Sequence, residues 1–197
     1  MAGRSFAGRW RAAAVAAAIG AFGLWAVAAP PVVGGVVRPT HPASSPLSAA
    51  QMGTVRRVVD GDTIDVRIDG VNRRIRLLQI DTPEVYGGTE CYGPQASAAM
   101  KRLLPVGTAV TLYADPALDR TDRYGRLLRY IFRGSTNINV WMVANGYAAP
   151  YFYRGDRGRY AASLERLARA AIVARRGLWG ACPAATYDPG SALDTGP

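Results

Sequence analysis

The stretch from Thr54 to Ile80 constrains the fold of this chain more than any other part of its sequence. It holds three strand-like runs that are separated by the turn-forming pairs Asp60-Gly61 and Asp69-Gly70. Three short strands joined by two tight turns predict an antiparallel meander. The runs are Thr54–Val59, Thr63–Ile68 and Asn72–Ile80.

Helices and further strands are expected after the meander. Proline in a first turn, proline or glycine after a last turn, and apolar residues at helical spacing mark the helices. Five short strands with a helix after the third match an OB-type order, so we predict a β-rich α+β fold, a five-stranded barrel with about three helices. The later elements are helices Gly93–Leu104, Val140–Asn145 and about Arg159–Arg176, and strands Ala109–Ala114 and Leu127–Phe132.

The N-terminus has the pattern of an export signal. Three arginines (Arg4, Arg9 and Arg11) precede the charge-free stretch 12–37, and Ala26-Val27-Ala28 offers a small-residue cleavage site. Prolines and glycines in the stretch favour a cleaved signal, although its length would also suit an uncleaved membrane anchor. In both cases we expect a secreted or extracytoplasmic domain.

Composition divides the chain into four parts. We predict a signal peptide or membrane anchor at 1–37, a Pro/Ser/Ala-rich linker at 38–53, a folded domain at 54–183 and a flexible tail at 184–197.

The net charge is +10, and the first 50 residues carry four arginines and no acid. The folded part is therefore basic, which favours a polyanionic partner such as nucleic acid. GC-rich coding is the alternative explanation for so many arginines.

Cys91 and Cys182 are the two cysteines of the chain. In an oxidising compartment an isolated pair usually forms a disulfide, which here would join the segment before the first helix to the segment after the last. Two separate thiols are the alternative.

Several catalytic chemistries are excluded by what the domain lacks. The single histidine, His41, lies in the linker, so the domain can build neither a Ser-His-Asp nor a Cys-His arrangement. It offers no His/Cys zinc cluster and no P-loop. Carboxylates and arginines remain, and these suit phosphoryl transfer with a hard cation.

Two carboxylate pairs flank the second and third predicted strands. Asp60 and Asp62 form one pair, and Asp81 and Glu84 form the other. Pairing of these strands would bring the two together, and calcium takes oxygen ligands of this kind. Each pair alone is also an ordinary turn sequence.

Arg76 lies within a largely apolar strand, where a guanidinium is costly unless it meets an anion. Asp62 and a phosphate are the candidate anions, and an edge arginine that reaches solvent is the alternative. Residues 120–126 (RTDRYGR) add three arginines and a tyrosine around a turn, suited to phosphate contact. Tyr151 and Tyr153 are available for base stacking, or for filling the core.

Together these residues resemble the staphylococcal (micrococcal) nuclease family from about Thr54 to Gly180. The motifs recur in the family order, and six in register make the resemblance specific. They are DGDT at 60–63, IRLLQIDTPE at 75–84, YGPQAS at 92–97, RTDRYGR at 120–126, NGYA at 145–148 and GLW at 177–179.

The resemblance implies a role for each matching residue. Two carboxylates and one backbone carbonyl would bind calcium, a glutamate would orient or deprotonate the attacking water, and two arginines would grip the scissile phosphate. A further arginine and three tyrosines would contact the bound nucleotide. The implied calcium ligands are Asp62, Asp81 and Thr82; the catalytic residues are Arg76, Glu84 and Arg126; the nucleotide-binding residues are Arg123, Tyr124, Tyr151 and Tyr153.

The resemblance also implies an activity: calcium-dependent hydrolysis of DNA and RNA with low sequence specificity, leaving 3′-phosphate ends. We expect single-stranded nucleic acid to be favoured, because stacking needs an unstacked base, and we expect a monomer. One alternative is a non-catalytic barrel that binds nucleic acid. The other is a domain anchored by the N-terminal segment that binds anionic envelope polymers.

Overall fold

The computed structural model describes residues 48–197, so the predicted signal or anchor and most of the linker lie outside the described residues. The first strand begins at Gln51, three residues before the predicted start of the domain. In the part of the chain that is described, no helix has the length and apolar character needed to cross a membrane.

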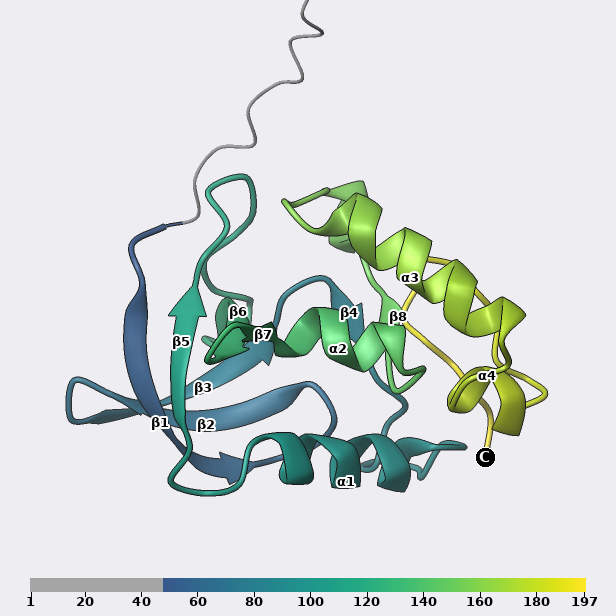
Figure 1. The fold of residues 1–197 in the computed structure, drawn as a ribbon, viewed down its shortest axis with the longest axis horizontal. Helices are drawn as coiled ribbons and strands as arrows, with labels where there is room; N and C mark the ends of the chain where they lie inside the picture. Colours follow the sequence, from purple (N-terminus) through teal and green to yellow (C-terminus); the bar gives the residue numbers. More distant parts are fainter. Residues whose placement is uncertain (1–47) are drawn as a thin grey trace, which may run out of the picture. The chain divides into compact units, whose positions relative to one another are not determined.

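Five strands close into a mixed barrel, as the sequence predicted (Figure 1). The first three form the expected antiparallel meander, and the remaining two pair antiparallel with each other. Closure comes from an antiparallel pairing of β1 with β5 and a parallel pairing of β3 with β6. The strands are β1 (Gln51–Val58), β2 (Thr63–Ile68), β3 (Val71–Leu77), β5 (Ala109–Tyr113) and β6 (Leu127–Arg133).

Alternation along the strands decides which side chains fill the barrel. Ile64, Val66 and Ile68 of β2 are buried, while Asp65 and Arg67 between them face outward. On β3, Ile75 and Leu77 are buried, so Arg74 and Arg76 lie on the outer face. The outer face of the meander therefore carries charged side chains over an apolar interior.

Three main helices pack around the barrel, with a short fourth helix and a 3-10 turn (Figure 1). The side chain of Asn137 caps α2 by accepting a hydrogen bond from the Val140 amide (3.1 Å). The last long helix is shorter than predicted, but Leu164 and Ala168 of its apolar stripe are fully buried. The elements are α1 (Gly93–Leu103), α2 (Ile138–Ala144), η1 (Tyr153–Gly155), α3 (Ala161–Val173) and α4 (Leu178–Ala181).

The third predicted strand, Asn72–Ile80, is wrong at its end. β3 stops at Leu77, and Gln79 adopts a left-handed conformation (φ 59°) before the short strand β4 (Ile80–Asp81). β4 leaves the barrel and pairs with β8 (Ala149–Pro150). A further short strand, β7 (Thr136–Asn137), was not predicted. The break redirects the chain so that Asp81 comes beside Arg76 of β3.

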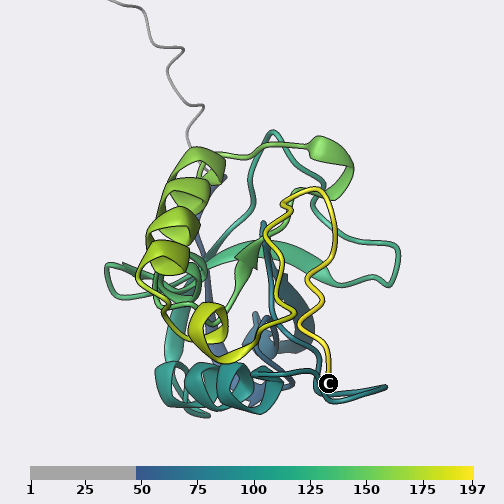
Figure 2. The same ribbon diagram turned by 90° about the vertical axis from the view of Figure 1, so that its right-hand side faces the viewer.

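The C-terminal segment folds back over the domain. A disulfide joins Cys91 to Cys182, as predicted from the isolated cysteine pair. Residues 184–197, predicted as a flexible tail, loop back beside α4 (yellow in Figure 2) and bury Leu193 and Thr195. The Cys91 amide donates to the Gly196 carbonyl (2.6 Å). The structure thus gives this segment specific contacts that its composition did not indicate.

Candidate active site

Asp62 and Asp81 meet at the guanidinium of Arg76. The Arg76 Nε lies 3.1 Å from Asp62 Oδ1, and Arg76 Nη2 donates to Asp81 Oδ1. All three side chains are largely buried, with 8–14% of their surface exposed. Asp62 comes from the turn before β2, Arg76 from β3 and Asp81 from β4, so strand pairing brings together residues distant in sequence.

Hydrogen bonds fix the first carboxylate pair and connect it to the segment that carries the second. Asp60 Oδ1 accepts from the amides of Asp62 and Thr63 at 3.0 and 2.7 Å, which shapes the first turn. Asp62 Oδ2 accepts from the amide and hydroxyl of Thr82 at 3.0 and 3.1 Å, which ties the first pair to the second. The predicted convergence of the two pairs is therefore present in the structure.

The Leu193 amide of the C-terminal segment donates to Asp81 Oδ2 at 2.8 Å. Sequence analysis did not find this contact, because a backbone amide carries no residue-type signal. As a result, each oxygen of Asp81 has a partner on a different element.

We call Asp60, Asp62, Asp81 and Glu84 the carboxylate cluster; one guanidinium, Arg76, faces it. Burial raises the pKa of Asp81 to about 7 although Arg76 opposes the shift, and Asp62 adds to it. Burial also raises the pKa of Asp60, with repulsion from Asp62 as the next cause. Burial and then repulsion from Asp62 and Asp60 raise the pKa of Glu84. Four carboxyl groups therefore face one guanidinium, and their burial and mutual repulsion favour the uptake of a proton or a cation.

The donor set suits a hard cation only in part. Among the described residues, no three His, Cys, Asp or Glu side chains lie close enough together to hold a metal ion. Calcium also accepts backbone carbonyls and water, so Asp62, Asp81 and the carbonyl of Thr82 match its chemistry, and the surplus negative charge favours a cation. Calcium binding remains a prediction.

Arg76 is almost fully engaged by the protein. Its Nη1 donates to the carbonyls of Leu77 (3.1 Å) and Ile80 (2.6 Å), and its Nε and Nη2 bind the two aspartates. Since a guanidinium has five N–H donors, one N–H on Nη2 remains for an added acceptor. The strand, its aspartates and the broken end of β3 hold this group in one orientation.

Arg76 and Arg126 line one cavity of about 440 Å³, which we call the arginine–tyrosine cavity. The loop before β6 forms one wall, and the segment after β8 forms another. The predicted site residues that line it are Arg76, Arg123, Tyr124, Arg126, Tyr151 and Tyr153. Three arginines and three tyrosines around one cavity can bind a phosphate beside an aromatic base.

Asp122 shapes the loop that carries Arg126. Its Oδ1 accepts from the amides of Tyr124 and Arg126 (both 2.9 Å), and its Oδ2 lies 2.5 Å from Arg126 Nε. Gly125 has a positive φ of 77°, which lets the loop turn there. The terminal nitrogens of Arg126 have no hydrogen-bond partner among the described residues, so this guanidinium can still offer its fork to an anion.

Two of the three tyrosines that line the cavity are exposed to solvent, and Tyr151 is half-buried. Tyr124 and Tyr153 are exposed by 67% and 51%, and Arg123 Nη2 donates to the Tyr124 hydroxyl at 2.6 Å. The rings of Tyr151 and Tyr153 are 6.5 Å apart and tilted by 60°. The exposure of Tyr153 favours base stacking over core filling for this residue.

Glu84 lies at the edge of the carboxylate cluster. Its side chain is exposed, and its carboxylate makes no hydrogen bond with the described residues. Its amide donates to Glu90 Oε2 at 3.0 Å, which anchors the backbone on either side of the exposed loop. Burial raises its pKa most, and repulsion from Asp62 and Asp60 adds to the shift, so its carboxylate lies within electrostatic range of the cluster.

Two polar residues that the sequence analysis missed hold this site together. The Gln79 carbonyl accepts from the Tyr151 amide (3.0 Å), and its side chain accepts from the Tyr130 hydroxyl (2.9 Å). The fully buried Asn139 donates to the Leu78 carbonyl (2.9 Å) and accepts from the Ile131 amide (3.0 Å). A polar residue inside an apolar run is the one signal that could have identified Gln79.

Comparison with known proteins agrees with the geometry. Residues 74–181 match the model of the family described as staphylococcal nuclease homologue. Thermonuclease of Staphylococcus hyicus is 34% identical over 141 residues, which cover 69% of this chain and 81% of that protein. An uncharacterized protein of Bacillus anthracis is 35% identical over 131 residues, covering 64% of this chain and 60% of that protein. Endonuclease YhcR of Bacillus subtilis (strain 168) is 31% identical over 150 residues, covering 71% of this chain and 12% of that protein. This chain belongs to the staphylococcal nuclease family.

Proposed function

We propose that this protein is a calcium-dependent nuclease that hydrolyses phosphodiester bonds of DNA and RNA with low sequence specificity. One observation carries the proposal: Arg76, bound to Asp62 and Asp81, lines the same cavity as Arg126. Relatives named thermonuclease and endonuclease support it. Calcium, the substrate range and the residue roles below are part of the proposal.

The two arginines are proposed to bind the scissile phosphate from different sides. Arg126 offers two terminal nitrogens that make no hydrogen bond with residues 48–197, and Arg76 offers the remaining N–H of its Nη2 together with its charge. A pentacoordinate phosphorus carries more negative charge on its oxygens than the ground state, so fixed cations stabilise it more strongly. The electrostatic contribution should therefore appear mainly in kcat.

Asp62, Asp81 and the carbonyl of Thr82 are the residues that would hold calcium. A bound divalent ion would supply charge stabilisation at the phosphate. In the protein itself, Arg76 orients both aspartates, and the Thr82 and Leu193 amides orient them further. These contacts keep the oxygens in place before any ligand arrives.

Glu84 is proposed to accept the proton of the attacking water. The water oxygen bonds to phosphorus as the bond from phosphorus to the 5′ oxygen breaks, and the leaving oxygen takes a proton from solvent. The products are a 3′-phosphate and a 5′-hydroxyl. The pKa of Glu84 is raised towards neutral pH, which is the direction that a general base requires.

Arg123, Tyr124, Tyr151 and Tyr153 are proposed to bind the nucleotide beside the scissile bond. Backbone charge and stacking carry little sequence information, so cleavage should be nonspecific and should favour single strands. We further propose that the protein acts as a monomer outside the cytoplasm, either secreted or anchored by its N-terminal segment. The disulfide between Cys91 and Cys182 fits an oxidising compartment.

The decisive experiment is a calcium titration of the purified protein with single-stranded DNA and RNA, followed by product-end analysis. We expect cleavage that rises with calcium, stops with EGTA and leaves 3′-phosphates. The Arg126→Ala variant, purified identically, controls for contaminating nucleases. DNA binding without cleavage at any calcium level would identify a non-catalytic barrel, and cleavage unaffected by EGTA would refute the metal assignment.

A further inference from the structure

A second hollow of about 630 Å³ lies on the outer face of the meander, beside the arginine–tyrosine cavity. We call it the arginine groove. Five arginines and one acid line it, so its net charge is positive. Its lining residues are Arg56, Arg57, Asp65, Asn72, Arg73, Arg74, Tyr124, Gly125 and Arg126.

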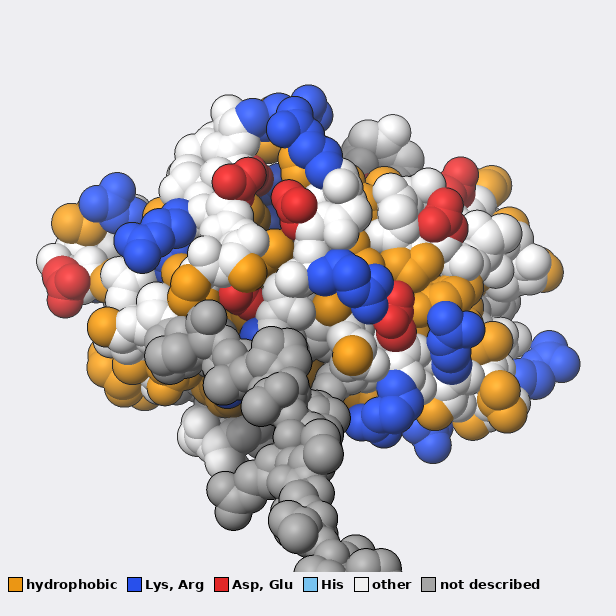
Figure 3. All heavy atoms as spheres, turned by 90° about the horizontal axis from the view of Figure 1, so that it is seen from above, with side chains coloured by type: hydrophobic (Ala, Val, Ile, Leu, Met, Phe, Trp, Pro, Cys, Tyr) orange, Lys and Arg blue, Asp and Glu red, His pale blue; other side chains and the backbone are white. Residues whose placement is uncertain are grey.

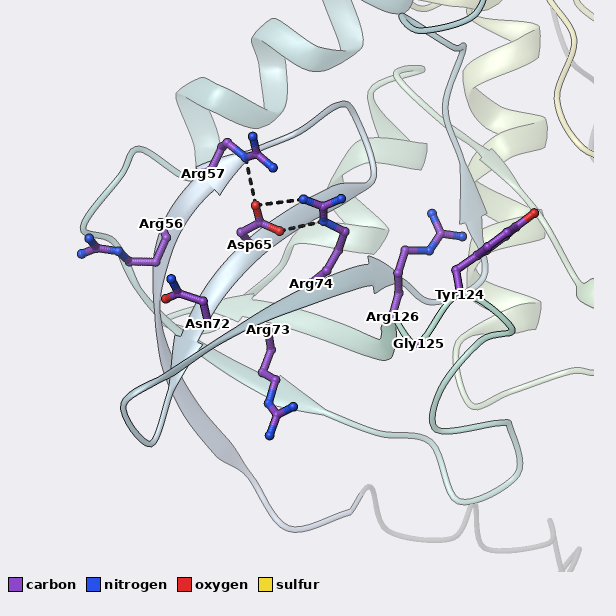
Figure 4. Close-up of a pocket in the computed structure, with 9 residues that line it drawn as sticks. All are labelled: Arg56, Arg57, Asp65, Asn72, Arg73, Arg74, Tyr124, Gly125 and Arg126. Atoms are coloured by element: carbon purple, nitrogen blue, oxygen red, sulfur yellow. Dashed lines mark hydrogen bonds and ion pairs between the residues drawn. The ribbon is translucent and has the colours of Figure 1, made fainter.

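Three of these residues form a row across the strands. Asp65 pairs with Arg57 across β1–β2 and with Arg74 across β2–β3. Its carboxylate lies 2.9 Å from Arg57 Nε and 2.8 Å from Arg74 Nε. Figure 4 shows Arg57, Arg74 and Arg126 pointing to the same side of the meander, whereas Arg73 extends the other way.

Asp65 positions the two arginines without neutralising them. One carboxylate faces two guanidiniums, and 61% of Arg57 and 46% of Arg74 remain exposed. Partial burial raises the pKa of Asp65, but hydrogen bonds from Arg74 and Arg57 outweigh burial and hold this pKa below its ordinary value. The carboxylate therefore stays ionised. The terminal nitrogens of Arg57 make no hydrogen bond within the described part of the chain, so they can still bind a phosphate.

The groove continues directly into the proposed active site. Tyr124 and Arg126 line both hollows. Arg74 and Arg76 are two residues apart on the same face of β3, a separation of about 6.8 Å along an antiparallel strand. An extended nucleic-acid strand with one phosphate at Arg76 and Arg126 can therefore place neighbouring phosphates at Arg74 and Arg57.

Figure 3 shows how charged side chains are distributed over one face of the molecule. In the face shown in Figure 3, Lys and Arg side chains stand in separate groups with Asp and Glu between them. The groove instead joins several guanidiniums in one hollow, in a protein whose excess charge is positive. A basic groove that follows the backbone, next to exposed aromatic side chains, is the arrangement that binds single strands without sequence preference.

We propose that the arginine groove binds the phosphates of the single strand that flank the scissile phosphate, on the side away from Tyr151 and Tyr153. The inference rests on the proposed function for the position of the scissile phosphate. It makes Arg57 and Arg74 binding residues for long substrates, with no part in the chemical step.

The test uses Arg57→Gln/Asp65→Asn/Arg74→Gln, which removes the row without leaving a lone carboxylate. Binding of a labelled single-stranded 12-mer is measured by fluorescence anisotropy in EGTA at several salt concentrations. Each lost phosphate contact should lower the slope of log affinity against log salt by about 0.7, so two lost contacts should lower it by about 1.4. In calcium, the KM of the variant should rise for the 12-mer and stay unchanged for a dinucleotide.

The matched control is Arg102→Gln/Arg166→Gln, two exposed arginines on α1 and α3 that do not line the groove. A wild-type slope in the row variant, or an equal fall in the control, would overturn the groove proposal and leave the nuclease proposal intact. If the wild-type protein cleaves neither substrate, the nuclease proposal fails, and the slopes still decide whether the groove binds strands. Should the row variant fail to fold, Arg57→Gln alone should lower the slope by about 0.7.

Discussion

The two arginines of the proposed site are held in opposite ways. Arg76 belongs to a strand, is 14% exposed and gives four of its donors to the protein. Arg126 follows a loop, is 28% exposed and is held by Asp122, which binds its Nε and its backbone amide, and by the ring of Tyr124, which lies 5.3 Å from its guanidinium carbon. From this difference we expect Arg76 to serve both folding and the proposed phosphate binding, and Arg126 to serve mainly the proposed phosphate binding. The following predictions test this contrast.

Arg76→Ala should have the largest effect, because it removes a phosphate donor and also the cation of the carboxylate cluster. We expect kcat to fall by at least about 10²–10³-fold. Loss of one partner of a buried ion pair typically costs about 3–5 kcal/mol, so the melting temperature in EGTA should fall as well. Calcium should restore part of that stability if it binds Asp62 and Asp81. Steady-state kinetics and calorimetry measure both effects. An unchanged melting temperature would contradict the expected role of Arg76 in folding.

Arg126→Ala should lower kcat by a similar factor of about 10²–10³ while the melting temperature changes little. Its one ion pair is partly exposed and local to the loop, so few other contacts depend on it. The same two measurements apply. A large drop in melting temperature would show that the loop arginine is structural too, and the contrast with Arg76 would be lost.

Cys91→Ser/Cys182→Ser should weaken the contacts around Arg76 and Asp81 and leave the loop that carries Arg126 unchanged. The disulfide closes a loop of 91 residues, for which the chain-entropy model gives about 4–5 kcal/mol of stabilisation. We expect a lower melting temperature in non-reducing buffer and weaker calcium binding, because the segment that reaches Asp81 is released. Activity at saturating calcium should persist at temperatures where the variant is folded. No change in melting temperature would contradict a stabilising role for the disulfide.

A pH dependence of stability should arise from Asp81. Its pKa of about 7 in the folded protein exceeds its ordinary value of 3.8, so the folded state holds a proton that the unfolded state has lost between these values. In EGTA, stability should therefore decline as pH rises from about 4 to about 7. Calcium should reduce this decline, because the ion compensates the carboxylate. The melting temperature from pH 5 to 8, with Asp81→Asn as control, tests this sign; an identical profile in the control would contradict it.

The sequence predicted those parts of the fold and site that local patterns encode. Turn-forming pairs and alternation identified the meander, and an isolated cysteine pair identified the disulfide. The motifs also named residues that the structure brings together, such as Asp62, Arg76 and Asp81, although their chemical roles remain predictions.

Features set by long-range contacts were not predictable. The break at Gln79 depends on hydrogen bonds from Tyr130 and Asn139, which are distant in sequence and have no local signature. The arginine groove depends on strand register, because only the pairing of β1, β2 and β3 brings Arg57 and Arg74 to one carboxylate.

The hydrogen bond from Leu193 to Asp81 has a consequence for the order of folding. Its two residues are 112 positions apart, so closing this contact requires one of the longest loops in the domain. Contacts of such high separation tend to form late, after local hairpins and helices have reduced the cost of loop closure. The barrel should therefore assemble before this carboxylate acquires its last partner, and catalytic competence should lag behind the return of secondary structure when the protein refolds.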